Sequence, residues 1–86
     1  MRKFEVRFRQ KGNPYGGVAK RFEVSAVSPR AAIRSFTFDP KAPSTDGLTW
    51  HSIAENGVVL TTLAQQRVGR HNFDENGEVV VLGENW

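Results

Sequence analysis

The residues of this 86-residue chain that could best do chemistry are cations gathered around a glycine-rich turn. Arginines alternate with other residues before the turn and recur after it, lysines flank the turn, and a tyrosine lies inside it. Guanidinium and ammonium groups bind phosphates or acidic side chains, and an exposed tyrosine can stack on a nucleobase. The sequence therefore predicts a binding surface for a protein or nucleic-acid partner, made of Arg7, Arg9, Lys11, Tyr15, Lys20 and Arg21.

The same region allows two other interpretations. Glu5 and Glu23 lie in the segments before and after the turn, where they could pair with the cations on a solvated sheet face. The glycines could instead form a phosphate loop, but such a loop needs a Gly-Lys-Ser/Thr ending that enters a helix. Residues 9–22, RQKGNPYGGVAKRF, lead into a strand-like segment, which favours a hairpin turn. The pairing of the cations with carboxylates stays open.

Motifs for catalysis or metal binding are not found in the sequence. His51 and His71 lie in separate predicted strands and lack the spacing of a ligand pair. No serine lies in a nucleophile-elbow sequence, and the lack of cysteine excludes disulfides and thiolate metal sites. We therefore predict that the protein is not an enzyme and has no catalytic residues, metal or cofactor.

Length and charge favour one domain that spans residues 1–86. Residues 1–34 carry nine Lys or Arg and two Glu, whereas residues 35–86 carry three Lys or Arg and seven Asp or Glu. This division indicates either a dipolar surface that faces one partner or mutual neutralisation after folding. The charged N-terminus lacks the apolar core of a signal peptide, and no segment is long enough to span a membrane, so we expect a cytoplasmic protein.

Alternating hydrophobic residues predict that the turn joins two strands. Phe4, Val6 and Phe8 point to one side of the first strand, and Glu5, Arg7 and Arg9 point to the other. Residues 20–26 repeat this pattern after the turn, with three hydrophobic residues on one side. The two segments should therefore pair as a β-hairpin with one apolar and one charged face.

A short helix is predicted from residue 29 to about residue 38. Ser28 can cap its first turn, and Pro29 suits the first helical position because its missing N–H would have no partner there. Asp39-Pro40 should end the helix, since the residue before proline avoids helical geometry. The apolar face comprises Pro29, Ala32, Ile33 and Phe36, whereas Arg30 and Arg34 lie opposite, with Thr37.

The remaining residues predict a meander of four strands. Asn-Gly pairs at 56–57 and 76–77 each indicate a hairpin, the first between residues 48–54 and 58–63, the second between 68–73 and 79–82. The fold class is therefore α+β, with one short helix packed on a twisted antiparallel sheet in the order β-β-α-β-β-β-β. We expect packing roles for Trp50, which would share a face with Leu48 and Ser52, and for Trp86.

The segment KRFEVSAVSPRAAIRSF, residues 20–36, resembles the strand-to-helix passage of small phage-encoded proteins, including some anti-CRISPR proteins. In that family an alternating Phe-x-Val-x-Ala strand leads to a capped, alanine-rich helix, which residues Phe22, Val24, Ala26, Ala31 and Ala32 match here. The acidic character usual in such inhibitors is found only in residues 35–86. KGNPY, residues 11–15, is also similar to a turn of filamentous-phage single-strand-binding proteins, but these are all-β barrels and the predicted helix disfavours that fold.

The phage-inhibitor resemblance implies a stoichiometric binder, in the cytoplasm of the host cell, that blocks a protein or nucleoprotein effector of the host. Such a role needs no active site and could use the basic surface against guide RNA or an acidic protein. The alternative is direct binding of single-stranded or duplex DNA or RNA by the basic hairpin.

Overall fold

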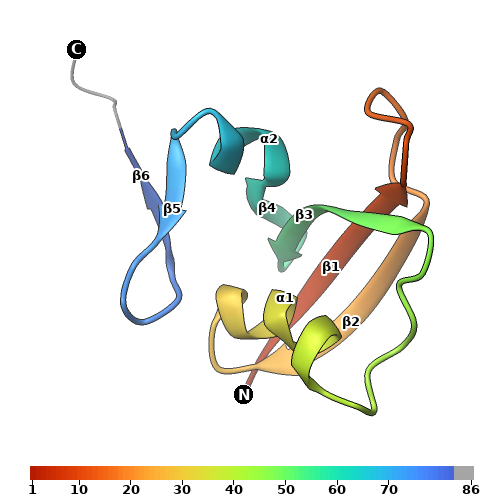
Figure 1. The fold of residues 1–86 in the computed structure, drawn as a ribbon. Coiled ribbons are helices and arrows are strands. Elements are labelled where there is room, and N and C mark those ends of the chain that lie inside the picture. The colour runs from red at the N-terminus through yellow and green to blue at the C-terminus, as the bar shows by residue number, and fades with distance from the viewer. Residues whose placement is uncertain (83–86) are drawn as a thin grey trace.

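The protein is described by a computed structural model that covers residues 1–82, so the expected role of Trp86 lies outside the described residues. A four-stranded antiparallel sheet has the order β2-β1-β3-β4, and β5 and β6 form a separate two-stranded sheet. Figure 1 shows this second sheet standing apart at one side. The predicted α+β class is confirmed. The elements are β1 Arg2–Gln10, β2 Lys20–Ala26, α1 Pro29–Phe38, β3 Leu48–Glu55, β4 Val58–Thr62, α2 Leu63–Arg67, β5 His71–Phe73 and β6 Val79–Val81.

The hydrophobic core lies between one face of the larger sheet and α1. Phe4 and Val6 of β1 are fully buried, and Ile53 of the neighbouring β3 is buried beside them. The helix contributes Ala32, which has no exposed surface, from the face that the sequence predicted to be apolar. Because side chains alternate along a strand, the same burial leaves Glu5, Arg7 and Arg9 of β1 on the opposite face. The first hairpin therefore has the two faces predicted from its sequence.

Helix α1 begins and ends where the sequence predicts. The Ser28 hydroxyl accepts a hydrogen bond from the N–H of Ala31 at 3.2 Å, and Pro29 occupies the first turn. At the other end the N–H of Asp39 donates to the carbonyl of Ser35, and the chain becomes extended before Pro40. The cap satisfies one of the donors that a helix start leaves without a partner, so it fixes where the chain turns from β2 into α1.

The predicted strand over residues 68–73 is wrong in its first half. Residues Leu63–Arg67 form the short helix α2, and only His71–Phe73 are extended. The Thr62 hydroxyl caps this helix by accepting from the N–H of Gln65 at 3.1 Å, and Gly69, with φ of 78°, allows the chain to leave it. Leucine, alanine, glutamine and arginine all have high helix propensity, and a prediction based on strand alternation does not take this into account.

A β-bulge in β3 corrects the predicted face of Ser52. Arg7 pairs with Ser52 but Phe8 pairs with Trp50, so β3 carries one extra residue, His51, between them. The bulge moves the following residues to the other face. Ser52 therefore lies on the side of Arg7, whereas Trp50 lies with Phe8 and packs against the core, its indole N–H donating to the Ser52 carbonyl at 3.0 Å.

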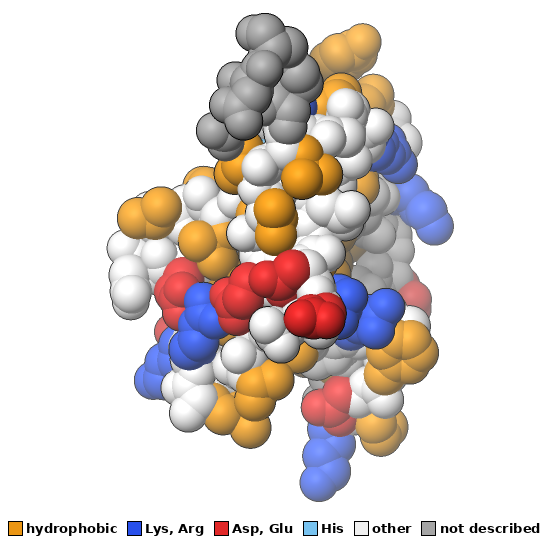
Figure 2. Space-filling view, turned by 90° about the vertical axis from the view of Figure 1, so that its left-hand side faces the viewer, with side chains coloured by type: hydrophobic (Ala, Val, Ile, Leu, Met, Phe, Trp, Pro, Cys, Tyr) orange, Lys and Arg blue, Asp and Glu red, His pale blue; other side chains and the backbone are white. Residues whose placement is uncertain are grey.

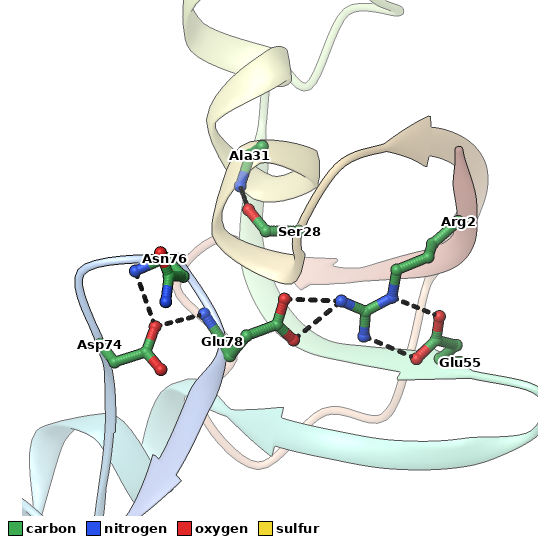
Figure 3. A network of polar contacts seen from close by, with 7 residues as sticks. All are labelled: Arg2, Ser28, Ala31, Glu55, Asp74, Asn76 and Glu78. Atoms are coloured by element: carbon green, nitrogen blue, oxygen red, sulfur yellow. Dashed lines mark hydrogen bonds and ion pairs between the residues drawn. The ribbon is translucent and has the colours of Figure 1, made fainter.

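The β5–β6 hairpin is tied to the rest of the molecule by Arg2 (Figure 3). The guanidinium donates to both carboxylate oxygens of Glu55 at 2.9 Å, and one of its nitrogens also contacts the carboxylate of Glu78, at 2.6 and 2.8 Å. Nearby, the carbonyl of Gly77 accepts a hydrogen bond from the N–H of Arg30 at 3.1 Å, in the first turn of α1. The turn before β6 is thus joined both to β1 and to the start of α1.

We expect this network to make stability depend on acid pH. Hydrogen bonds from Arg2 hold the pKa of the Glu55 carboxyl below its ordinary value of 4.5. A depressed folded-state pKa stabilises the fold fully above the unfolded value, and the contribution is lost as the pH falls through the folded value. The free energy of unfolding, measured by urea titration between about pH 7 and about pH 3, should therefore decline below about pH 4.5.

The substitution Glu55→Gln should reduce this decline, because the amide does not titrate. The matched control is Glu23→Gln, since that carboxylate is exposed and, within residues 1–82, pairs only with Lys3, at 3.8 Å. The control should keep the pH dependence of the natural chain. An unchanged decline in Glu55→Gln would show that Arg2 gives no preference to the charged carboxylate.

Candidate binding surface

The larger sheet brings together three of the predicted cations on its outward face. Arg7 and Arg21 are directly opposite residues of β1 and β2. Arg9 lies two residues beyond Arg7 on the same side of β1, next to Thr49 of β3. Strand pairing across the hairpin therefore makes one surface from residues that the loop separates in sequence.

Carboxylates neutralise part of this face, as predicted by the alternative in which Glu5 and Glu23 pair with the cations. The Nε atom of Arg7 lies 2.6 Å from the carboxylate of Glu5, and that of Arg21 lies 3.8 Å from the same group. Lys3 and Glu23 form a further, exposed pair. A shallow depression of about 480 Å³ covers this area, and both cations and carboxylates line it. Arg7 and Arg21 are thus held in place, but they share one counter-charge.

The turn of the first hairpin presents Tyr15 to solvent. Its side chain is 97% exposed, and the turn stands away from the sheet in Figure 1. The turn is nevertheless tied down: the N–H of Gly16 donates to the carbonyl of Asn13 at 3.1 Å, and the N–H of Lys11 donates to that of Gly47 at 3.0 Å. An aromatic ring on a hydrogen-bonded turn can be buried by a partner with little loss of backbone entropy.

Lys20 lies on the other side of the hairpin from Arg21. It is the residue opposite Phe8, and its Nζ atom lies 5.8 Å from the centre of the Phe22 ring. The sequence predicts one binding surface for Lys20 and Arg21, but strand alternation places residues 20 and 21 on opposite faces. We define the hairpin surface by the five remaining residues, Arg7, Arg9, Lys11, Tyr15 and Arg21.

A second depression, of about 510 Å³, lies between the hairpin and α2 and was not predicted. Arg9 and Arg67 contribute two cations to it, and His51, on the bulge of β3, lies in its wall. Among residues 1–82, no carboxylate lines this depression. We call it the cationic groove; its residues are Arg9, Pro14, His51, Thr62, Leu63, Ala64, Arg67 and Val68.

The side of the molecule that carries the β5–β6 hairpin is acidic in its centre. Figure 2 shows acidic side chains gathered there between basic ones. Asp74 is engaged in the turn itself, where one carboxylate oxygen accepts from the N–H groups of Asn76 and Glu78. Glu78 binds Arg2. The ion pairs of Arg2 with Glu55 and Glu78 therefore join the basic half of the sequence to its acidic half, as the mutual-neutralisation alternative predicted.

Within residues 1–82 no three histidine or acidic side chains gather as a metal site would require. The helices described over the same residues are too short and too polar to cross a membrane. Comparison with protein-family models, with curated proteins and with solved structures finds no match to this chain.

Proposed function

We propose that this protein is a non-enzymatic inhibitor of the phage-encoded, anti-CRISPR type, which binds a nucleoprotein effector of the host stoichiometrically through its hairpin surface. The observation that carries the proposal is Tyr15, 97% exposed on a hydrogen-bonded turn, with Lys11 in the same turn and arginines on the strand below. Tyrosine and arginine are the residues that most often dominate binding energy in protein interfaces.

The arrangement suits a nucleoprotein better than a purely acidic protein. Arg7 and Arg21 share the Glu5 carboxylate, so this part of the surface carries both signs of charge. Arg9 and Lys11 have no carboxylate within 4.0 Å among residues 1–82, and they can contact phosphates. A partner that offers both protein side chains and guide-RNA phosphates would complement this mixture.

Direct binding of single-stranded nucleic acid is the second candidate function. The cationic groove favours it, since Arg9 and Arg67 lie there without a carboxylate in the lining. Electrostatic binding of this kind weakens steeply with salt because condensed counterions are released. Mobility shift of free RNA or DNA by the protein alone, lost as salt is raised, would favour this candidate over the inhibitor.

The inhibitor proposal predicts a defined loss of function in a hairpin variant. Lys11→Glu with Tyr15→Ala should abolish inhibition of target cleavage by purified CRISPR effector nucleoproteins, because it reverses one charge and removes the exposed ring. Both residues are exposed, so the free energy of unfolding should change by less than about 1 kcal/mol. The measurement is cleaved product against inhibitor concentration, with an end point near one inhibitor per effector for the natural chain.

The matched control is Phe38→Ala with Lys41→Glu, which makes the same chemical changes at another exposed site. It should inhibit as well as the natural chain. Equal inhibition by the hairpin variant would show that the turn only joins two strands. Absence of inhibition by the natural chain, across effectors of all types tested, would remove the inhibitor proposal.

A further inference from the structure

We propose that the cationic groove binds a nucleotide, with the phosphate between Arg9 and Arg67 and the base on the apolar side chains of the loop and of α2. This site shares Arg9 with the hairpin surface and Pro14 with its turn, but it does not depend on the inhibitor proposal. The arguments are the charge of the lining, its hydrogen-bonding groups and its volume.

The first argument compares the two depressions that carry arginines. In the one over β1 and β2, Arg7 and Arg21 already contact Glu5. In the cationic groove the lining contains no Asp or Glu, and neither arginine has a carboxylate within 4.0 Å among residues 1–82. Two arginines that line one depression with no carboxylate beside them favour a dianionic group, and guanidinium matches the geometry of phosphate oxygens.

The second argument concerns the polar groups beside the arginines. The Nδ1 atom of His51 lies 2.8 Å from the hydroxyl of Ser52, which is buried. When that hydroxyl donates to Nδ1, the neutral ring carries its proton on Nε2, which is then a donor for a ligand. The Thr62 hydroxyl accepts from the N–H of Gln65 and keeps its own hydrogen to donate. The polar part of the groove is therefore rich in donors, as a phosphate requires.

The third argument concerns the rest of the lining and the volume. Pro14, Leu63, Ala64 and Val68 contribute apolar surface, and Val68 is 69% exposed although it is hydrophobic. A nucleobase can lie with its flat face on such side chains. The volume of about 510 Å³ falls within the range of sites that hold one small molecule. Acidic side chains of a peptide would supply one charge each and no comparable flat apolar body, so a nucleotide fits better.

The test is titration of isotope-labelled protein with three probes, followed by the amide signals of the groove residues. The probes are inorganic phosphate, uridine 5′-monophosphate and an oligothymidylate of about eight nucleotides. We expect the mononucleotide to bind more tightly than phosphate and to shift the signals of Arg9, His51 and Val68. An oligonucleotide that binds much more tightly identifies a single strand as the source of the nucleotide, whereas equal affinity identifies a free nucleotide.

Two double variants separate a specific groove from general positive charge. Arg9→Gln with Arg67→Gln should weaken binding of the mononucleotide or oligonucleotide by about tenfold or more, since each lost arginine removes a charge-assisted contact. The matched control, Arg7→Gln with Arg21→Gln, removes the same charge from cations that Glu5 already pairs, and should weaken it by less than about threefold. The salt dependence of oligonucleotide binding should become shallower only in the groove variant.

The hairpin variant, Lys11→Glu with Tyr15→Ala, should bind the mononucleotide as the natural chain does, because neither residue lines the groove. The nucleotide-binding proposal and the inhibitor proposal can thus be contradicted independently of each other. Equal weakening in both double variants would overturn the proposal in favour of non-specific attraction. Equal affinity for phosphate and mononucleotide, or no shift of groove signals with any probe, would overturn it as well.

Discussion

Gly77→Ala should lower the free energy of unfolding by about 2–3 kcal/mol, because two costs add at this position. Gly77 has φ of 79°, a conformation that costs a residue with a Cβ atom roughly 1–2 kcal/mol. The added Cβ would lie 2.5 Å from the Ser28 hydroxyl oxygen and 3.1 Å from the Ser28 Cβ. Ser28 cannot turn away without giving up its cap on α1, which is worth about 1 kcal/mol.

The control for this prediction is Gly57→Ala in the other Asn-Gly hairpin. Gly57 has nearly the same φ, 78°, but an added Cβ there has no neighbour within 4 Å. Only the backbone cost of roughly 1–2 kcal/mol should remain. Urea titrations of the two variants give the difference directly. Equal losses would mean that the β5–β6 turn can move away from α1 at little cost.

Phe8→Ala should produce the other large effect, a loss of about 3–5 kcal/mol in the free energy of unfolding. The Phe8 side chain is 5% exposed and packs against two other rings, with centroids 5.7 Å from Phe22 and 5.0 Å from Phe36, which are themselves 5.3 Å apart. Both contacts are edge-on, which aromatic rings favour. Removing this ring creates a cavity and breaks both contacts, so thermal or urea unfolding should show a clear loss of stability.

Alanine substitutions of two further phenylalanines give stability losses with which the loss in Phe8→Ala can be compared. Phe38 is 74% exposed at the end of α1, and Phe38→Ala should change stability by less than about 0.5 kcal/mol. Phe22 is half-buried, so Phe22→Ala should fall between the two. The expected order of losses is therefore Phe8, Phe22, Phe38. A Phe22 loss equal to that of Phe8 would indicate that the three rings act as one unit.

Local signals in the sequence were sufficient to predict the first half of the fold. Strict alternation in β1 and β2, and a Ser-Pro start for α1, each depend on neighbouring residues only, and the structure confirms them. The helix α2 was missed because residues 63–67 span little more than one turn, too few to show helical periodicity. The bulge at His51 was missed because it arises from pairing with β1, which no local pattern in β3 reveals.

For the candidate surfaces, too, local patterns predicted which residues share a face but not which distant elements meet. Alternation predicted that Arg7 and Arg21 would lie on one face, and they pair directly. Lys20 was grouped with them because it flanks the turn, and its face could not be assigned until the start of β2 was known. The cationic groove joins residues of the hairpin, β3 and α2, and Arg67 could not be placed without that helix. Long-range proximity of this kind is fixed by tertiary packing.

The ion pair between Arg2 and Glu78 has a consequence for the order in which the chain can fold during synthesis. Its two residues are separated by 76 positions, and the Arg2–Glu55 pair spans 53. A ribosome releases the N-terminal strands first, so β1, β2 and α1 can associate while the carboxylates that bind Arg2 are still unmade. The guanidinium must then remain hydrated until residues 55 and 78 emerge in turn. Closure of this contact is therefore a late event, and the nascent chain keeps one end of its sheet open until then.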